Sequence, residues 1–269
     1  MSTTDLVPEA LWALIAPLLP KPKRRRFRFP GRKRLDDRRV LAGILFILKS
    51  GLPWNDLPRE FGCGCGSTCY HRLRAWQRRG VWTKIHQVLL AELRHADQID
   101  WSRAVVDSIS TRALKRGPYT GRNPTDRGKQ GVKHHTLVDG QGTPISSTIT
   151  GANQADITQR KALVAAIPAV GGKPGPPKRH FAALYGDRGY DSEPHRDWLR
   201  AQQIEPHLAK RRTPHGSGLG IVRWVVERTQ AWKLAFRKLR VSTDRLPSVH
   251  RALDTLANAI ICWRILQWA

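Results

Sequence analysis

Three acidic residues stand inside apolar segments, where solvated carboxylates are uncommon. Asp107 closes the run AVVD, Asp187 ends FAALYGD, and Glu227 lies inside VVER. A carboxylate set against apolar segments is costly unless it has a cation or strong hydrogen-bond donors. Taken singly, each acid is simply explained as the partner of an arginine. The three together, on two strand-like runs and then a helix-like one, favour a fold that gathers them around metal ions.

The charge of the chain indicates a polyanionic partner. It has 47 Lys plus Arg against 21 Asp plus Glu, a formal net charge of +26 over 269 residues. This excess is far greater than solubility requires, and nucleic acid is the usual partner of such a chain. The 10 tryptophans and the long apolar pattern favour a folded enzyme or regulator over a packaging protein. Acids that hold metal in a basic chain predict the cutting or joining of nucleic acid.

Neither a membrane span nor a disulfide framework is expected. The longest apolar stretch, residues 40–48, is much shorter than the ~20 residues that cross a bilayer, and no N-terminal signal pattern is present. We therefore expect a soluble cytoplasmic protein associated with the nucleoid. Cys63, Cys65 and Cys69, with His71, suggest zinc, but their spacing is unusual for a zinc site and favours buried or incidental thiols, as for Cys262.

Residues 1–99 are predicted to form a helical DNA-binding domain. Helices are expected at 8–19, 36–49, 54–61, 68–79 and 81–95, with Ser67 capping the fourth and Gly80 ending it. In that fourth helix Tyr70, Leu73 and Trp76 share one face, and the basic residues point elsewhere. The pattern predicts a helix-turn-helix arrangement, and an ordinary amphipathic surface helix is the alternative.

A basic arm, residues 21–34, precedes the second helix and carries Phe27 and Phe29 among its cations. Because the arm leads directly into a helical pattern, we expect it to lie along a DNA backbone or minor groove. A solvated linker is the alternative interpretation of such a charge run.

Residues 100–269 are predicted to form an α/β catalytic domain, a mixed sheet flanked by helices. Strands are expected at 104–111, 131–139, 144–150, 181–185 and 205–208, and helices at 156–167, 193–203 and about 219–239. A basic loop rich in Gly and Pro, KRGPYTGRNPTDRGK, separates the first two strands.

Seven motifs give the chain a resemblance to the IS5 family of DDE transposases from bacterial insertion sequences. They are GRKRLDDRRVLAGILF, GLPWNDLPREFG, RRGVW, DWSRAVVDS, YGDRGYDS, HGSGLG and RWVVERTQAWKLAFRKLR, and the similarity runs from about Arg26 to Leu266. The resemblance implies an RNase H-like catalytic core with a DDE triad, preceded by a helical domain that binds the element's ends. The matching positions are Asp107, Asp187 and Glu227.

The resemblance implies binding of the terminal inverted repeats, metal-dependent DNA strand cleavage and strand transfer. Two Mg²⁺ ions roughly 3.5 to 4 Å apart would activate a water and stabilise the leaving 3′ oxygen, and Mn²⁺ is expected to substitute. The partners are double-stranded DNA of the element ends and the target, and a homodimer or higher assembly on DNA. The expected DNA-binding residues are Arg24, Arg25, Arg26, Arg28, Arg32, Lys33, Arg34, His71, Arg72, Arg74, Arg78, Arg188 and Arg228.

Several residues near the triad leave alternatives open. Arg188 and Arg228, each next to an acid, could hold phosphate oxygens or pair with the carboxylates. His134 and His135 alternate faces along a strand, so at most one can face the site, and a core or surface role is favoured for both. The segment HGSGLG could move over DNA or serve only as a linker.

Two positions depart from the family pattern. Gln230 and Lys233 stand where apolar residues are common, as in an element copy that has begun to decay. A domesticated or decayed sequence-specific DNA-binding protein is therefore one alternative function. A stand-alone RNase H-like nuclease, which would use the same acids, is another.

Overall fold

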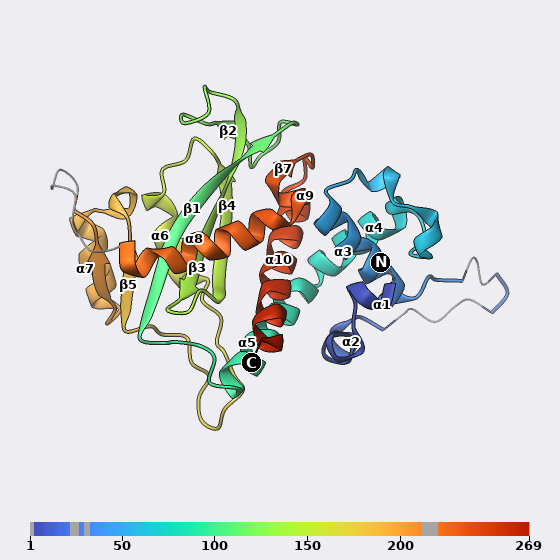
Figure 1. The fold of residues 1–269 in the computed structure, drawn as a ribbon, viewed down its shortest axis with the longest axis horizontal. Helices are drawn as coiled ribbons and strands as arrows, with labels where there is room; N and C mark the ends of the chain where they lie inside the picture. Colours follow the sequence, from blue (N-terminus) through green and yellow to red (C-terminus); the bar gives the residue numbers. More distant parts are fainter. Residues whose placement is uncertain (1–2, 22–26, 30–32, 211–219, 269) are drawn as a thin grey trace.

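A computed structural model describes residues 3–21, 27–29, 33–210 and 220–268 of the chain. Within these residues, a helical N-terminal part leads into a sheet that has helices on both faces, and a long helix ends the chain (Figure 1). None of the described helices is long and apolar enough to cross a membrane.

The N-terminal part consists of helices joined by short turns. Its elements are α1 Thr3–Leu6, α2 Glu9–Ile15, η1 Ala16–Leu18, α3 Asp37–Ser50, η2 Trp54–Asp56, η3 Arg59–Phe61, α4 Gly66–Arg78 and α5 Val81–His95. The Asp36 side chain caps α3 by accepting the Arg39 amide, and Gly51, with φ 76°, ends the helix in the left-handed region.

Two local predictions in this part are wrong. Residues 54–61 do not form one helix, because Pro58 disfavours helical backbone at Leu57 and separates two 3₁₀ turns. Ser67 is not the cap of α4, since the helix begins earlier, at Gly66, and its N-cap residue is Cys65. Cys63, Cys69 and Cys262 are buried and Cys65 is exposed, and all four thiols are free.

The sheet is mixed, as predicted. Its order is β2-β3-β1-β5-β6, with β4 on β3 and β7 on β1. Strands β1, β3 and β4 pair antiparallel, whereas β5 and β6 continue the sheet in parallel from β1. The strands are β1 Arg103–Ala113, β2 Gly121–Arg122, β3 Gln130–Asp139, β4 Pro144–Gly151, β5 Ala183–Gly186, β6 Glu205–Leu208 and β7 Val241–Ser242.

Helices cover both faces of this sheet. The remaining elements are α6 Ile157–Ala165, η4 Arg188–Tyr190, α7 Glu193–Ala201, α8 Gly220–Ala235, α9 Arg237–Arg240 and α10 Pro247–Gln267. Helix α8 crosses one face, where Val225 and Val226 pack on Val105 and Val138. On the opposite face α6 lies against β4, and the Leu163 carbonyl accepts a hydrogen bond from Ser146 Oγ at 2.8 Å.

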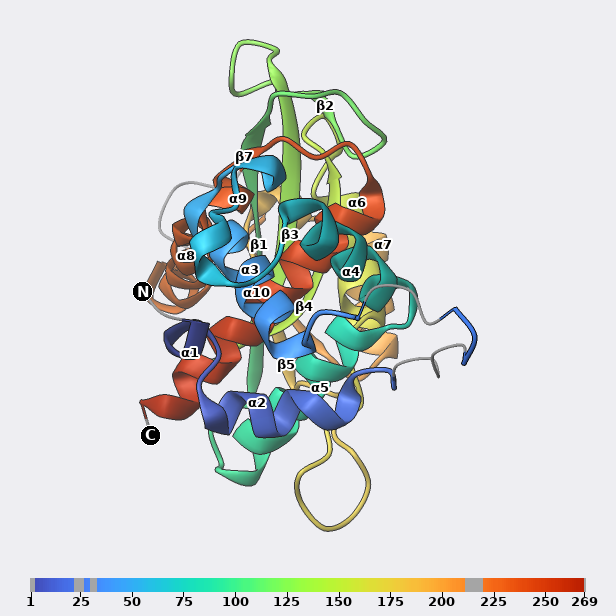
Figure 2. The same cartoon turned by 90° about the vertical axis from the view of Figure 1, so that its right-hand side faces the viewer.

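The C-terminal helix α10 joins the two parts of the molecule, and the sequence interpretation did not include it. Helix α10 lies against α4, α5 and β4 (Figure 2). Its buried residues belong to one apolar core that extends from Leu6 to Trp263. The predicted helix at 219–239 is also interrupted, because extended backbone at Phe236 separates α8 from α9. The division at residue 99 stays a prediction, and the change from helices to strands falls between α5 and β1.

Candidate active site

Asp107 and Asp187 lie level with each other on neighbouring parallel strands. The register pairs Val106 with Gly186, so the next residues are the two acids, at the point where β5 ends. Asp187 Oδ1 accepts the Gly189 amide at 2.9 Å and thereby caps η4. Ligands bind outside the carboxyl ends of parallel strands in open α/β sheets, and Asp187 occupies such a position, with Asp107 beside it within β1.

Glu227 approaches the pair from α8 through an arginine. Arg223 Nη2 is 3.5 Å from Asp107 Oδ2 and 3.9 Å from Glu227 Oε1. Arg223 and Glu227 are one helical turn apart, so they share a side of α8. The guanidinium therefore lies between two of the three predicted acids. The sequence interpretation missed Arg223, and its only signal was this spacing of four residues.

The acids differ in exposure. The side chain of Asp107 is 14% exposed, whereas that of Glu227 is 61% exposed. Burial raises the pKa of Asp107 to about 6; the Ser108 amide and Arg223 oppose the rise, and the charges of Asp187 and Glu227 add to it.

Glu227 lies on the exposed side of α8. It shares this side with the exposed Trp224, because α8 packs on the sheet through its other side. The buried residues of α8 are Val225, Val226, Thr229, Gln230 and Lys233.

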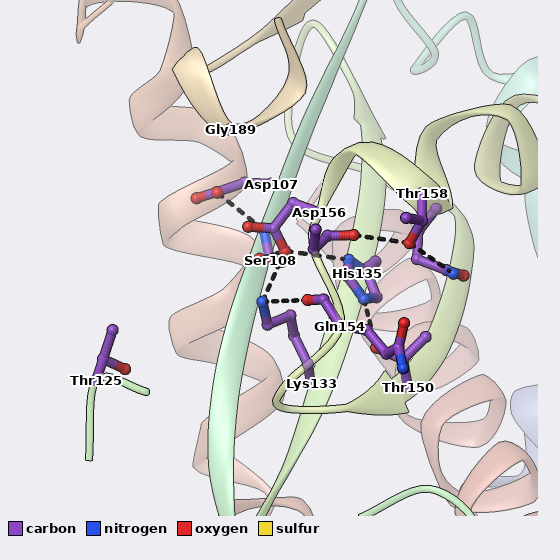
Figure 3. Close-up of polar contacts among 12 residues, drawn as sticks. Asp107, Ser108, Thr125, Lys133, His135, Thr150, Gln154, Asp156, Thr158 and Gly189 are labelled. Atoms are coloured by element: carbon purple, nitrogen blue, oxygen red, sulfur yellow. Dashed lines mark hydrogen bonds and ion pairs between the residues drawn. The ribbon is translucent and has the colours of Figure 1, made fainter. Parts of the chain in front are cut away.

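A second polar cluster lies beside Asp107, around an acid that the sequence interpretation missed (Figure 3). Ser108 Oγ donates to Asp156 Oδ1 at 2.7 Å, while the Ser108 amide donates to Asp107 Oδ1 at 2.8 Å. Asp156 Oδ1 is also 3.1 Å from Lys133 Nζ and 3.6 Å from His135 Nδ1. Asp156 precedes α6 and does not belong to a long apolar run, which is why its local sequence did not distinguish it.

The two histidines on β3 face opposite ways, as predicted. His135 faces the Asp156 cluster, and its pKa is lowered to about 4, first by burial. His134 instead faces α10, where its Nδ1 is 2.9 Å from Asp254 Oδ1.

Gly189 allows η4 to pass close to two of these carboxylates. A Cβ at this position would lie 3.0 Å from Asp187 Oδ1 and 3.5 Å from Asp156 Oδ2. Burial, followed by the charges of Asp156, Asp107 and Asp187, raises the pKa of the neighbouring Tyr190 well above its ordinary value.

The carboxylates of Asp107, Asp187 and Glu227 suit a hard divalent cation. Carboxylate oxygens are the ligands that Mg²⁺ and Mn²⁺ prefer. Within residues 3–21, 27–29, 33–210 and 220–268, no three acidic, histidine or cysteine side chains converge closely enough to enclose an ion. The positive charge between Asp107 and Glu227 is instead that of Arg223.

Arg228 points away from the acids. Its guanidinium lies 4.7 Å from the ring centroid of Trp224 and 4.6 Å from that of Trp232, and it donates to the Gln141 carbonyl. Arg228 was predicted to hold phosphate or to pair with a carboxylate. It forms no ion pair with an acid in the described chain. Arg188 directly follows Asp187 at the start of η4.

The basic residues of α4 have unequal access to a partner. Arg72 forms an ion pair with Asp37 and has a cation–π contact with Trp76, while Arg74 lies over the Tyr70 ring. His71 and Arg78 are exposed and, with Ser67 and Ala75, border one open depression.

The basic arm is described only in part. Arg28, Lys33 and Arg34 are exposed, and Arg34 also pairs with Asp37. Arg24, Arg25, Arg26 and Arg32, and the segment 215–219, lie outside the described residues.

Comparison with known proteins agrees with this architecture. Residues 102–262 match the transposase DDE domain, and residues 7–86 match a putative transposase family of the IS4/5 type. A solved structure of piggyBac transposase in a synaptic complex with hairpin DNA aligns with a TM-score of 0.50 at 10% identity, covering 98% of this chain and 74% of that one. The fold is therefore that of an RNase H-like transposase core.

Two relatives from Burkholderia cepacia are much closer in sequence. A putative transposase for insertion sequence element IS402 is 51% identical over 152 residues, 56% of this chain and 72% of the relative. An uncharacterised 16.2 kDa protein of the same element is 56% identical over 119 residues, 44% of this chain and 81% of the relative. The chain belongs to the IS4/5 family of DDE transposases, which act on DNA and use divalent metal ions.

Proposed function

We propose that Asp107, Asp187 and Glu227 are the catalytic carboxylates of this transposase and would hold two Mg²⁺ ions. When bound, such ions supply Lewis-acid activation of the attacking oxygen and stabilise the leaving 3′ oxygen. The observation that carries the proposal is the relative position of three elements: β1 and β5 set the aspartates level, and Arg223 links the first of them to Glu227.

The protein's own residues would prepare this site for a phosphodiester. Asp107 is fixed by the Ser108 amide, and Ser108 is fixed in turn by Asp156, so the carboxylate keeps one orientation. Arg223 holds Asp107 and Glu227 near each other without metal. Its planar fork also suits the non-bridging oxygens of a phosphate that enters between the acids.

Metal binding without DNA tests this assignment directly. The wild-type chain should bind Mn²⁺ in a calorimetric titration, and Asp107→Asn or Glu227→Gln should weaken that binding sharply. Asp139→Asn is the matched control: its pKa is likewise raised to about 6 by burial, and it lies in the same strand pair, opposite Ala104. Equal Mn²⁺ affinity in the wild type and in the Asp107 and Glu227 variants would overturn the assignment.

We infer that α4 binds the element's terminal repeats through the stripe of Ser67, His71, Ala75 and Arg78. These residues recur at helical spacing on an exposed face, as in a helix that enters a major groove. Arg72 serves mainly to hold α4 on α3 through Asp37.

Substitution of Arg78 and of Arg72 separates base reading from helix docking. Arg78→Ala should reduce the preference for repeat DNA over random DNA, at a cost of about 1 to 3 kcal/mol for each base that the side chain reads. Arg72→Ala should mainly lower stability. If only Arg72→Ala abolished the preference in a folded protein, the stripe would not be the reading face.

The remaining DNA contacts follow from charge and from the reaction. We propose that the arm of residues 21–34 follows the DNA backbone and that Arg188 and Arg228 border the bound strand. Because two element ends must be joined together, a homodimer or higher assembly on DNA is proposed. The place of action is then the nucleoid.

A further inference from the structure

The segment between β1 and β3 carries an unusual concentration of positive charge. Residues 112–129, called here the β1–β3 extension, contain one acid, Asp126. Its cations are Arg112, Lys115, Arg116, Arg122, Arg127 and Lys129. All six are exposed, and none forms an ion pair with any residue that the structure describes.

Another loop of similar composition shows that this lack of partners is not general. Residues 171–180 are also rich in Gly, Pro and basic residues, but their cations are held by the protein. Lys173 pairs with Asp97, Lys178 lies 5.5 Å from the Trp101 ring centroid, and Arg179 donates to the Ile167 carbonyl at 3.3 Å. Of these two loops, the extension alone presents its whole positive charge to solvent, where like charges repel one another unless an anion is bound.

The outer loop of the extension is held in one conformation by hydrogen bonds within the loop. The buried side chain of Asn123 accepts from Thr125, at both its amide and its hydroxyl, and the Asn123 backbone bonds to Lys129 and Gly128. Arg127 adopts φ 49°, a left-handed conformation that is uncommon for residues other than glycine. Three cations, Arg122, Arg127 and Lys129, therefore project from a fixed turn and lose little conformational freedom on binding.

The base of the extension packs on the segment between β7 and α10, and that segment contacts the helical part. β1 carries Asp107 and, five residues later, Arg112, a separation of roughly 17 Å along an extended strand. A Cβ at Gly117 would lie 2.7 Å from the Arg245 carbonyl oxygen, and the adjacent Asp244 accepts a hydrogen bond from Trp54 in the helical part at 3.2 Å. Figures 1 and 2 show the extension rising beyond the end of the sheet, above β7 and α9.

We propose that the β1–β3 extension is a DNA-binding arm. It binds the phosphate backbone of the duplex DNA that extends away from the proposed catalytic acids. The unpaired cations supply the charge, the fixed turn supplies their spacing, and β1 sets their distance from Asp107. The exposed guanidinium and ammonium groups suit phosphate oxygens, and such contacts position DNA without reading its sequence. The proposal rests on the proposed function, because it places the bound DNA relative to Asp107, but the binding test below is independent of the triad.

The test compares two triple variants that each remove three positive charges. One is Arg122→Gln, Arg127→Gln, Lys129→Gln in the extension. The control is Lys173→Gln, Lys178→Gln, Arg179→Gln in the loop 171–180. Binding to a fluorescent random-sequence duplex is measured in EDTA over a series of salt concentrations, so the result does not depend on metal or cleavage. Circular dichroism confirms that both variants are folded.

The extension variant should flatten the plot of log K against log salt by up to about 0.9 for each phosphate that it no longer neutralises, and the control should retain the wild-type slope. An equally flattened slope in both variants, or an unchanged slope in the extension variant, would overturn the proposal. Cleavage of an uncut repeat duplex, and strand transfer by pre-cut ends into a plasmid, then identify the DNA. A defect confined to cleavage assigns the arm to the element's flank, and one confined to transfer assigns it to the target.

Discussion

Lys233 and Asp254 carry opposite charges in the interior of the molecule, between α8, α10 and the sheet. Lys233 Nζ is 2.8 Å from Asp254 Oδ1, and Ser147 Oγ donates to Asp254 Oδ2 at 2.5 Å. Burial works to raise the pKa of Asp254, but Lys233 and His134 outweigh it and hold that pKa below its ordinary value. Lys233 is therefore a paired residue, and it lends no support to the interpretation of this position as a sign of decay.

Removal of Lys233 alone should lower the stability of the protein far more than removal of both Lys233 and Asp254. We expect Lys233→Ala to lower the free energy of unfolding by about 3 to 5 kcal/mol, because it leaves Asp254 charged and buried without a cation. Lys233→Met with Asp254→Leu should recover much of that loss. Urea denaturation provides the measurement, with Arg200→Ala as a control at an exposed pair that should show no clear change. A Lys233→Ala protein as stable as the Arg200→Ala protein would contradict this account.

A residue of the candidate site could be predicted where it differs clearly in character from its neighbours in the sequence. Asp107, Asp187 and Glu227 could be found because each is an acid within or after an apolar run. Arg223 is one of 47 basic residues and could not be distinguished from the rest without its distance to both acids. Asp156 comes to the site only through the pairing of β1, β3 and β4, which local sequence does not specify.

At the scale of elements, strands and amphipathic helices were predicted well and long buried helices were not. Helix α5 and strand β6 have the predicted bounds, because their apolar residues recur at helical or alternating spacing. Helix α10 is buried over most of its circumference, with Asn258 and Asp254 inside the core, so its sequence lacks a clear polar face. The sheet could be predicted as mixed, but the pairing of β7 with β1 depends on the turn at Phe236.

The junction between α5 and β4 should make stability depend on pH. His86 Nε2 is 2.8 Å from the Pro144 carbonyl oxygen, and burial lowers the pKa of His86 to about 4. The unfolded chain takes up this proton near pH 6.5, whereas the folded chain resists until about pH 4. The stabilising contribution is thus complete above pH 6.5 and is lost as the pH falls through this window, by about 1.4 kcal/mol per pH unit.

The variant His86→Gln isolates this effect, because glutamine retains a donor for the carbonyl but does not titrate. Its unfolding free energy should fall less steeply than that of the wild type between pH 6.5 and pH 4. Denaturant titrations of both proteins at several pH values measure the difference. Parallel curves would show that His86 does not carry the acid sensitivity. His135, whose pKa is also lowered to about 4, should still contribute in both proteins.

In the whole molecule, the proposed catalytic acids and the helical part belong to one packed structure. The acids come from β1, from the end of β5 and from α8, and α8 packs on the sheet next to α10. Helix α10 also packs on α4 and α5, so the proposed DNA-reading helix is joined to the catalytic sheet by a continuous apolar core. We expect the position of bound DNA relative to the acids to be set by this core.

The most direct test of the catalytic assignment is strand cleavage of a duplex carrying the element's inverted repeat, measured in Mg²⁺. Asp107→Asn, Asp187→Asn and Glu227→Gln should each abolish cleavage while the fold and DNA binding are retained, because the proposed DNA-binding stripe lies on α4. Asp139→Asn, which removes a buried carboxylate elsewhere on the same strand pair, should still cleave. The wild type should be inactive in EDTA. Full cleavage by Asp107→Asn, or cleavage by the wild type in EDTA, would contradict the metal–carboxylate mechanism.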